Sequence, residues 1–80
     1  GAEVALVSRH REGITRLSAR ATRNATLKGV HLGEIMAGLA EKLGGDGGGH
    51  DGAAGWSGEA DRVAVESAFI HSLSGIVRAE

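Results

Sequence analysis

Alternating apolar and polar positions predict two neighbouring strands at the start of the chain. Residues 3–8 hold a short apolar run with β-branched side chains, which is typical of a buried strand. Residues 14–22 alternate between apolar and polar side chains with a period of two, the pattern of a strand with one buried face. The polar stretch 9–13 ends in glycine and is predicted to be a turn that joins the two strands into a hairpin.

Two later segments show the spacing of helices. Between His31 and Leu43, apolar residues recur at intervals of three and four, and Gly44 follows as a residue suited to the end of a helix. Residues 59–79 predict a second helix with acidic residues in its first turn. The predicted apolar stripe of this second helix comprises Val63, Ser67, Ile70, Leu73 and Val77, widened by Val65, Phe69 and Ile76.

A glycine-rich segment, residues 44–55, separates the two predicted helices. Such a composition usually indicates a flexible linker or a tight helix-to-strand junction. The segment contains no serine, however, and it ends in Ala53, Ala54 and Gly55, which predict a third strand of very small residues. The predicted order is strand, strand, helix, glycine loop, strand, helix. This order indicates one α+β domain over residues 1–80, a small mixed β-sheet packed with two helices.

Composition excludes several classes of site. The chain has 80 residues, 14 of them glycine, and contains neither cysteine nor proline. Without cysteine there are no disulfides and no thiolate zinc sites, which fits a reducing cytoplasm, where we expect the protein to reside. No apolar run in the sequence is long enough to span a membrane, so we expect no membrane partner.

Charge is distributed unevenly, although the net charge is only −1. Residues 1–30 carry six basic and two acidic side chains, a balance of +4, whereas residues 31–80 carry three basic and eight acidic ones, a balance of −5. A basic first third can concentrate an anionic ligand on one side of a small domain. The alternative is that these charges are solvated on the faces of strands.

The glycine run 47–49 is a candidate phosphate site. Consecutive glycines free the backbone for conformations in which successive N–H groups turn inward and form an anion-binding concavity, a nest. His50 follows the run with a hydrogen-bonding ring, and Arg16 and Arg20 could add positive charge from the polar face of the second strand. A P-loop and a dinucleotide fingerprint do not fit, because both place their glycines between a strand and a following helix.

The same residues carry a resemblance to a known family. Gly47–His50, followed after two residues by Ala53–Gly55, resembles the GGGHxxAAG signature of the DHH-associated domain, the C-terminal half of DHH-family phosphoesterases. Residues Ser18–Arg20 are similar to the SxR strand motif of that family. The segment Val30–Met36 is similar to the helix start of archaeal RecJ-like, single-strand-specific exonucleases, and the whole resemblance spans residues 3–75.

The resemblance implies substrate binding rather than bond cleavage. In this family, main-chain amides, a histidine and a strand arginine hold phosphate or nucleic-acid backbone. The corresponding residues here are Gly47, Gly48, Gly49, His50, Ser18 and Arg20, to which strand position and charge add Arg16 and Arg23. We expect the partner to be a single-stranded nucleic acid or a nucleotide. The alternatives are a small substrate (nanoRNA, a cyclic dinucleotide or a phosphoadenosine nucleotide) and a protein-interaction module whose acidic second helix docks a replication or repair protein.

The catalytic half of such enzymes binds two Mn²⁺ or Mg²⁺ ions through clustered Asp and His side chains, including a DHH triplet. This sequence has no DHH triplet, so we expect no catalytic residues, no metal ligands and no cofactor in the chain itself. We therefore expect a domain of a longer phosphodiesterase or exonuclease, partnered by the catalytic DHH domain of its parent chain, or a stand-alone remnant.

The remaining aromatic and histidine residues have simpler interpretations. Trp56 either stacks on a nucleobase or packs in the core between a helix and the sheet. The spacing of His10, His31 and His71 fits no zinc pattern, and we expect structural roles for all three.

Overall fold

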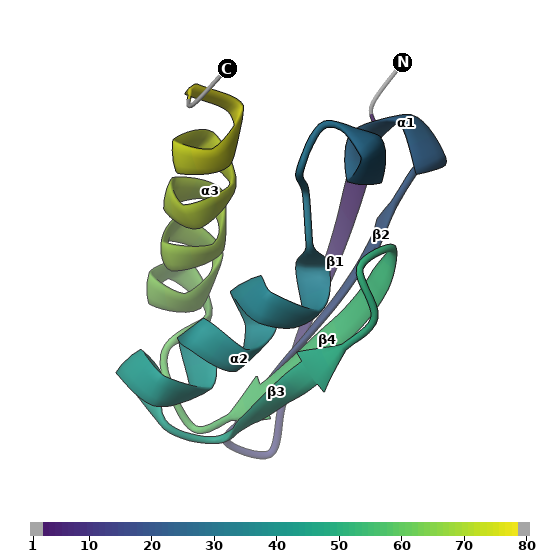
Figure 1. Cartoon of the computed structure of the whole chain (residues 1–80). Coiled ribbons are helices and arrows are strands. Elements are labelled where there is room, and N and C mark those ends of the chain that lie inside the picture. Colours follow the sequence, from purple (N-terminus) through teal and green to yellow (C-terminus); the bar gives the residue numbers. More distant parts are fainter. Residues whose placement is uncertain (1–2, 79–80) are drawn as a thin grey trace.

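Two antiparallel hairpins form a four-stranded sheet in the order β1-β2-β4-β3 (Figure 1). The strands are β1 (Val4–Arg11), β2 (Ile14–Ala21), β3 (Asp46–Gly49) and β4 (Ala53–Gly58). The computed structural model describes residues 3–78, with side chains described through residue 75. All three strand pairs are antiparallel, so the α+β fold class is confirmed, whereas a mixed sheet is wrong.

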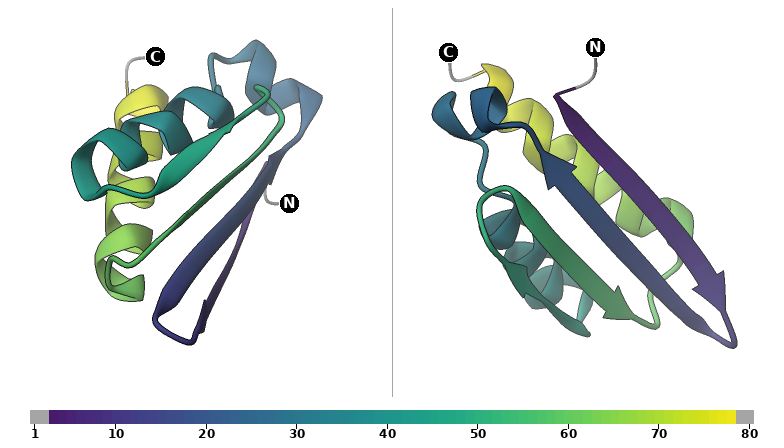
Figure 2. Two further views of the ribbon diagram at one scale, coloured as in Figure 1. Left: turned by 90° about the horizontal axis from the view of Figure 1, so that it is seen from below. Right: turned by 90° about the vertical axis from the view of Figure 1, so that its right-hand side faces the viewer.

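The helices lie on one face of the sheet. They are α1 (Arg23–Leu27), α2 (Leu32–Leu43) and α3 (Arg62–Arg78). Figure 2 (right) looks onto the strands from the other side, with α2 and α3 behind them. The face turned away from α2 and α3, which carries the exposed side chains of β1 and β2, is called the outer face below.

The first hairpin extends further than the sequence predicts. Residues Arg9–Arg11 belong to β1 and pair with β2, so the turn contains only Glu12 and Gly13. Both turn residues have positive φ, 53° and 82°, which is the mark of a two-residue primed turn whose twist matches that of the strands it joins. The predicted longer turn is therefore wrong, because glycine at the second position allows the tight connection.

The glycine segment contains a strand instead of a continuous loop. Residues Asp46–Gly49 form β3 and pair with Ser57 through Ala54 of β4. Glycine disfavours strands by itself, but here it lets α2 lie directly on the backbone. A Cβ at Gly47 would overlap the Met36 carbonyl oxygen and lie 2.7 Å from its carbonyl carbon. Tertiary packing thus overrides the low strand propensity of the run.

The short helix α1 was not predicted either. Thr22 is its N-cap, and the Thr22 hydroxyl accepts a hydrogen bond from the Ala25 N–H at 3.2 Å. Capping by threonine is a common way to start a helix. Strand β2 therefore ends at Ala21, one residue earlier than the alternation suggests.

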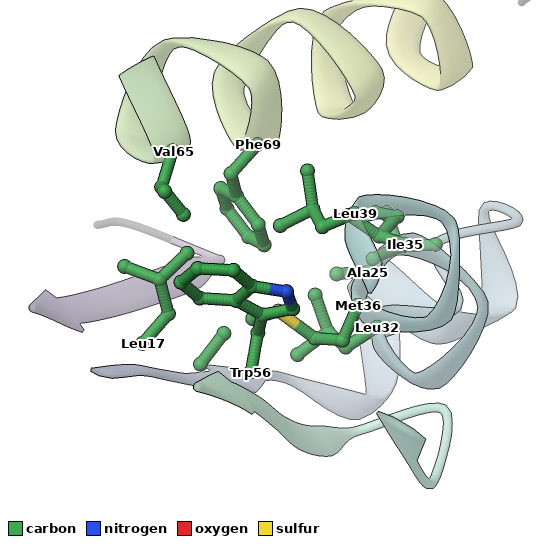
Figure 3. Packing of buried hydrophobic residues seen from close by; sticks show 11 residues of the cluster. Leu17, Ala25, Leu32, Ile35, Met36, Leu39, Trp56, Val65 and Phe69 are labelled. Carbon is green, nitrogen blue, oxygen red and sulfur yellow. The ribbon is translucent and has the colours of Figure 1, made fainter. Parts of the chain in front are cut away.

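The core lies between the sheet and the two long helices, α2 and α3 (Figure 3). Trp56 is 2% exposed and its indole N–H donates to the Gly44 carbonyl at 3.0 Å, so it is a core residue and not a base-stacking one. In the part of α3 whose side chains the structure describes, residues 62–75, the buried side chains are Val65 and Phe69. Val63 and Ile70 of the predicted stripe are 68% and 57% exposed, so these two positions are wrong, whereas Leu73 packs partly buried against the core. Ile76 and Val77 of the predicted stripe lie outside the residues whose side chains the structure describes. The ring of Phe69 extends from α3 toward Trp56 (Figure 3).

Two histidines have the structural roles expected of them. His10 forms a hydrogen bond through Nδ1 with the hydroxyl of the buried Thr15, at 2.8 Å. His31 is the N-cap of α2, and its Nδ1 accepts from the Glu34 N–H at 3.1 Å. His71 lies exposed on α3.

A polar contact attaches α3 to β1. The Ser8 hydroxyl donates to the Glu66 carboxylate, and Arg62 Nε donates to both Ser8 Oγ at 2.9 Å and Glu66 Oε2 at 3.1 Å. The hydrogen bond from Ser8, and then that from Arg62, lowers the pKa of Glu66 below its ordinary value. The contact therefore favours the ionised carboxylate.

This contact makes a pH-dependent contribution to stability. A depressed pKa in the folded state stabilises the fold above the unfolded-state pKa, and this stabilisation is lost as the pH falls through the lowered pKa. We expect Glu66→Gln to lower the thermal midpoint at pH 7 and to lower it less at pH 3. Glu41→Gln, which removes an exposed carboxylate on α2, is the control. A difference between wild type and Glu66→Gln that is the same at both pH values would contradict the assignment.

Candidate functional site

Strand β2 presents a row of polar side chains on the outer face. Arg16, Ser18 and Arg20 are exposed, and they alternate with Thr15, Leu17 and Ala19, which are at most 3% exposed. This confirms the alternation predicted from the sequence. The outer face is accessible to a ligand because no helix packs over it (Figure 2, right).

The strand register brings Gly48 of the predicted site to the same face, whereas Gly47 and Gly49 alternate to the face that packs on the helices. Arg20 pairs with Ala53 of β4, and Ser18 pairs with Gly55, which in turn pairs with Gly48 of β3. His50 follows β3 directly, and its N–H donates to the Ala53 carbonyl at 2.8 Å. Two strand spacings, about 10 Å, therefore separate the backbone of Ser18 and Arg20 from that of Gly48 and His50.

Small residues form the floor between these two sides. Gly55 and Ala53 of β4 separate β2 from β3, and Gly48 lies beyond them. A Cβ built on Gly48 would meet nothing within 4 Å, so the space above this residue is open. A ligand can therefore approach the backbone at Gly48 more closely than it could at a residue with a side chain.

The glycine run does not form the expected nest. A nest needs successive N–H groups that converge, whereas in an extended strand successive N–H groups point to opposite edges. Because the His50 N–H is bonded to Ala53, the alternation of the ladder directs the Gly48 N–H toward β4 and those of Gly47 and Gly49 away from it. The glycines contribute a flat surface and close approach, not a concavity of amides.

The N-terminus of α2 is also occupied by protein groups. Leu32 N–H donates to the Asp51 carbonyl at 2.9 Å, and Gly33 N–H donates to the His50 carbonyl at 2.8 Å. These bonds satisfy amides that a helix otherwise leaves free for an anion. They also fix the β3–β4 turn, and with it His50, against the helix.

The two added arginines differ in position. Arg16 lies on the outer face, directly opposite Arg9 of β1. Arg23 is the first residue of α1, so the strand alternation that suggested it does not apply. Its role in phosphate binding stays a prediction.

Sequence reasoning missed two further arginines of the outer face. Arg9 and Arg11 are exposed at the end of β1, where a turn was predicted. Extending the alternation from Val7 through Arg11 would have found them. Among the residues that the structure describes, none of Arg9, Arg11, Arg16 and Arg20 has an acidic side chain within 4.0 Å, because the two ion pairs there are Lys28–Glu3 and Arg62–Glu66.

The part of the chain that is described offers no alternative metal centre. Within residues 3–78, no three His, Cys, Asp or Glu side chains are grouped so that they could hold a metal ion. The helices in that range include none with the length and hydrophobicity needed to traverse a membrane.

The chain matches one known family of domains. The sequence model described as DHHA1 domain matches residues 1–77, nearly the whole chain. No curated protein matches the chain significantly.

Proposed function

The chain belongs to the DHHA1 domain family, the DHH-associated domain of DHH-family phosphoesterases, and on that premise we propose that its outer face binds the phosphate backbone of a single-stranded nucleic acid. The observation that carries the proposal is the strand register. It sets Ser18 and Arg20 on one side, and Gly48 and His50 on the other, of a floor of small residues on an uncovered face.

Each group has a distinct task in this proposal. The Arg20 guanidinium is suited to bidentate hydrogen bonding with two phosphate oxygens, and the Ser18 hydroxyl can donate to a third. The His50 ring supplies a donor from the opposite side, while Gly48 lets the ligand lie against the strand. The described residues do not provide ligands for the metal pair of the family. We therefore assign cleavage, in a RecJ-like exonuclease or related phosphodiesterase, to a separate catalytic domain.

The site is suited to the backbone more than to the bases. Sequence-tolerant single-strand binding usually uses aromatic side chains on which bases stack. The chain has one Trp, one Phe and no Tyr, and both Trp56 and Phe69 are buried. Binding that depends on phosphate contacts should therefore vary little with base sequence and should weaken strongly with salt.

The alternative that α3 docks a protein partner through its acidic residues has less support. Asp61 accepts hydrogen bonds from the N–H groups of Val63 and Ala64 at 3.1 and 3.3 Å, and so caps the helix. Glu66 is engaged by Ser8 and Arg62. The carboxylates considered for docking are Glu59, Asp61 and Glu66. Two of these three thus have contacts inside the domain.

Fluorescence anisotropy with labelled single-stranded DNA and RNA tests the proposal. We expect Arg20→Ala to weaken binding by roughly tenfold and His50→Ala to weaken it less, because a guanidinium makes two charge-assisted bonds and the imidazole one. Gly48→Val should also weaken binding, because a branched side chain would then stand over the floor. Lys42→Ala is the charge-matched control, since Lys42 lies in the last turn of α2, on the helical side. Equal affinities for wild type, Arg20→Ala and His50→Ala would refute the proposal.

A further inference from the structure

A second basic group lies on the outer face, at the turn of the first hairpin. Arg9 and Arg16 are direct cross-strand neighbours, and Arg11 lies two residues beyond Arg9, opposite Ile14. All three arginines are exposed. They are called the hairpin arginines below.

The hairpin arginines surround a hollow. A cavity of about 320 Å³ is lined by Arg9, Arg11, Glu12, Ile14 and Arg16. Three arginines and one glutamate line it, so the cavity has a positive charge balance. The side chain of Ile14 gives it one apolar wall, which suits a ligand with both an anionic and a less polar part.

The pairing of Arg9 with Arg16 is unfavourable without a counter-charge. Like charges directly opposite each other on adjacent strands destabilise an antiparallel pair. Within residues 3–78, neither arginine has an acidic group within 4.0 Å, although Glu12 lines the same cavity. A phosphate between the two guanidinium groups would remove the repulsion and accept hydrogen bonds from both.

The position of the cavity defines the length of the ligand. Arg16 and Arg20 are four residues apart on β2, so their backbones are about 13 Å apart. At the rise of about 3.4 Å per nucleotide of a stacked strand, this distance corresponds to roughly four nucleotides. The row between them, Val7, Ser18, Gly55 and Gly48, presents small or apolar residues over which a chain can pass.

We propose that the hairpin arginines form a second phosphate subsite, which engages the same strand about four nucleotides from Arg20. This inference rests on the proposed function and deepens it. It makes the ligand an oligonucleotide that runs along β2, and not a mononucleotide or a cyclic dinucleotide, which can fill only one of the two subsites.

A length series tests the second subsite. Fluorescein-labelled oligothymidylates and oligouridylates of two, four and eight nucleotides are titrated with wild type, Arg9→Ala/Arg16→Ala and Arg20→Ala. We expect the double variant to bind the eight-nucleotide strand about five- to tenfold more weakly and the dinucleotide almost unchanged. Its salt dependence for the longer strand should be less steep by about 0.7 in log–log slope, because the one phosphate contact of this subsite is lost.

The outcomes separate the two proposals. If the double variant binds the eight-nucleotide strand like wild type while Arg20→Ala binds it weakly, the second subsite is wrong and the proposed function stands. If Arg20→Ala binds every length like wild type, the proposed function is wrong. If the double variant weakens the dinucleotide as much as the longer strand, the hairpin arginines act as general charge and the second subsite is again wrong.

A gain of affinity provides a test that misfolding cannot imitate. Glu12 is the one acidic side chain that lines the cavity. Glu12→Gln keeps the size of the side chain and removes its charge, so it should strengthen binding of the eight-nucleotide strand by about two- to threefold and leave the dinucleotide unchanged. Unchanged or weaker binding of the longer strand would overturn the second subsite.

Discussion

Replacing Gly33 by Ala is expected to destabilise the domain by about 2–3 kcal/mol, the upper part of the range typical of a steric overlap in a packed interior. A Cβ at Gly33 would overlap the Gly49 carbonyl oxygen and lie 2.8 Å from its carbonyl carbon. The obstacle is backbone, which cannot rotate away as a side chain can. Relief requires α2 to move from the β3–β4 turn, and this would break the hydrogen bonds from Leu32 and Gly33 to Asp51 and His50.

The same helix supplies the control for this substitution. Gly38 also lies inside α2, and a Cβ there would meet nothing within 4 Å. Gly38→Ala should therefore stabilise the domain by about 0.5–1 kcal/mol through helix propensity alone. Urea unfolding followed by circular dichroism measures both variants. Two alanine variants that both stabilise the domain would show that α2 does not approach Gly49 as closely as described.

Gly33→Ala should also impair ligand binding, although Gly33 is buried behind the sheet. Its N–H holds the His50 carbonyl, so displacement of the helix releases the residue that follows β3. The folded fraction of this variant is therefore expected to lose affinity, whereas Gly38→Ala keeps the affinity of wild type. The close contact between α2 and the β3–β4 turn thus connects the packing of the domain with the geometry of its outer face.

Local patterns were sufficient where a segment's own residues determine its structure. The alternation of β2 identified its buried and exposed sides, and therefore placed Arg16, Ser18 and Arg20 on one face. The apolar spacing and Gly44 located α2 to within one residue. In these segments propensity and burial agree, so the sequence alone was informative.

Local patterns failed to predict the structure of segments whose conformation depends on contacts with residues distant in the sequence. A run of glycines has no strand propensity of its own, and β3 forms because β4 supplies a pairing partner and α2 packs closely over Gly47. Helix α3 is apolar on more than one side, so periodicity could not tell that Phe69 faces the core and Ile70 does not. The predicted nest was wrong for the same reason. The amides of the run belong to a strand of the β3–β4 ladder, and the local sequence does not predict that pairing.

Trp56→Ala is expected to have the other large effect, a loss of about 3–5 kcal/mol, which is typical for removing a buried aromatic side chain. Trp56 packs among Leu17, Met36, Val65 and Phe69 (Figure 3), so its removal leaves a cavity where the sheet and the two long helices meet. It also deprives the Gly44 carbonyl of the indole donor at the end of α2. An 80-residue domain has a total stability of only about 4–12 kcal/mol, so this variant should be largely unfolded in moderate urea.

Two further variants separate the contributions of volume and hydrogen bonding. Trp56→Phe keeps much of the ring volume but not the N–H. Its free energy of unfolding should therefore lie between those of wild type and Trp56→Ala. Leu27→Ala removes a large apolar side chain that is 77% exposed on α1, and it should change stability by no more than about 0.5 kcal/mol. Circular dichroism must report the unfolding, because Trp56 is the only tryptophan of the chain. If Trp56→Ala and Leu27→Ala had similar unfolding midpoints, Trp56 would not be central to the core, and base stacking on it would again have to be considered.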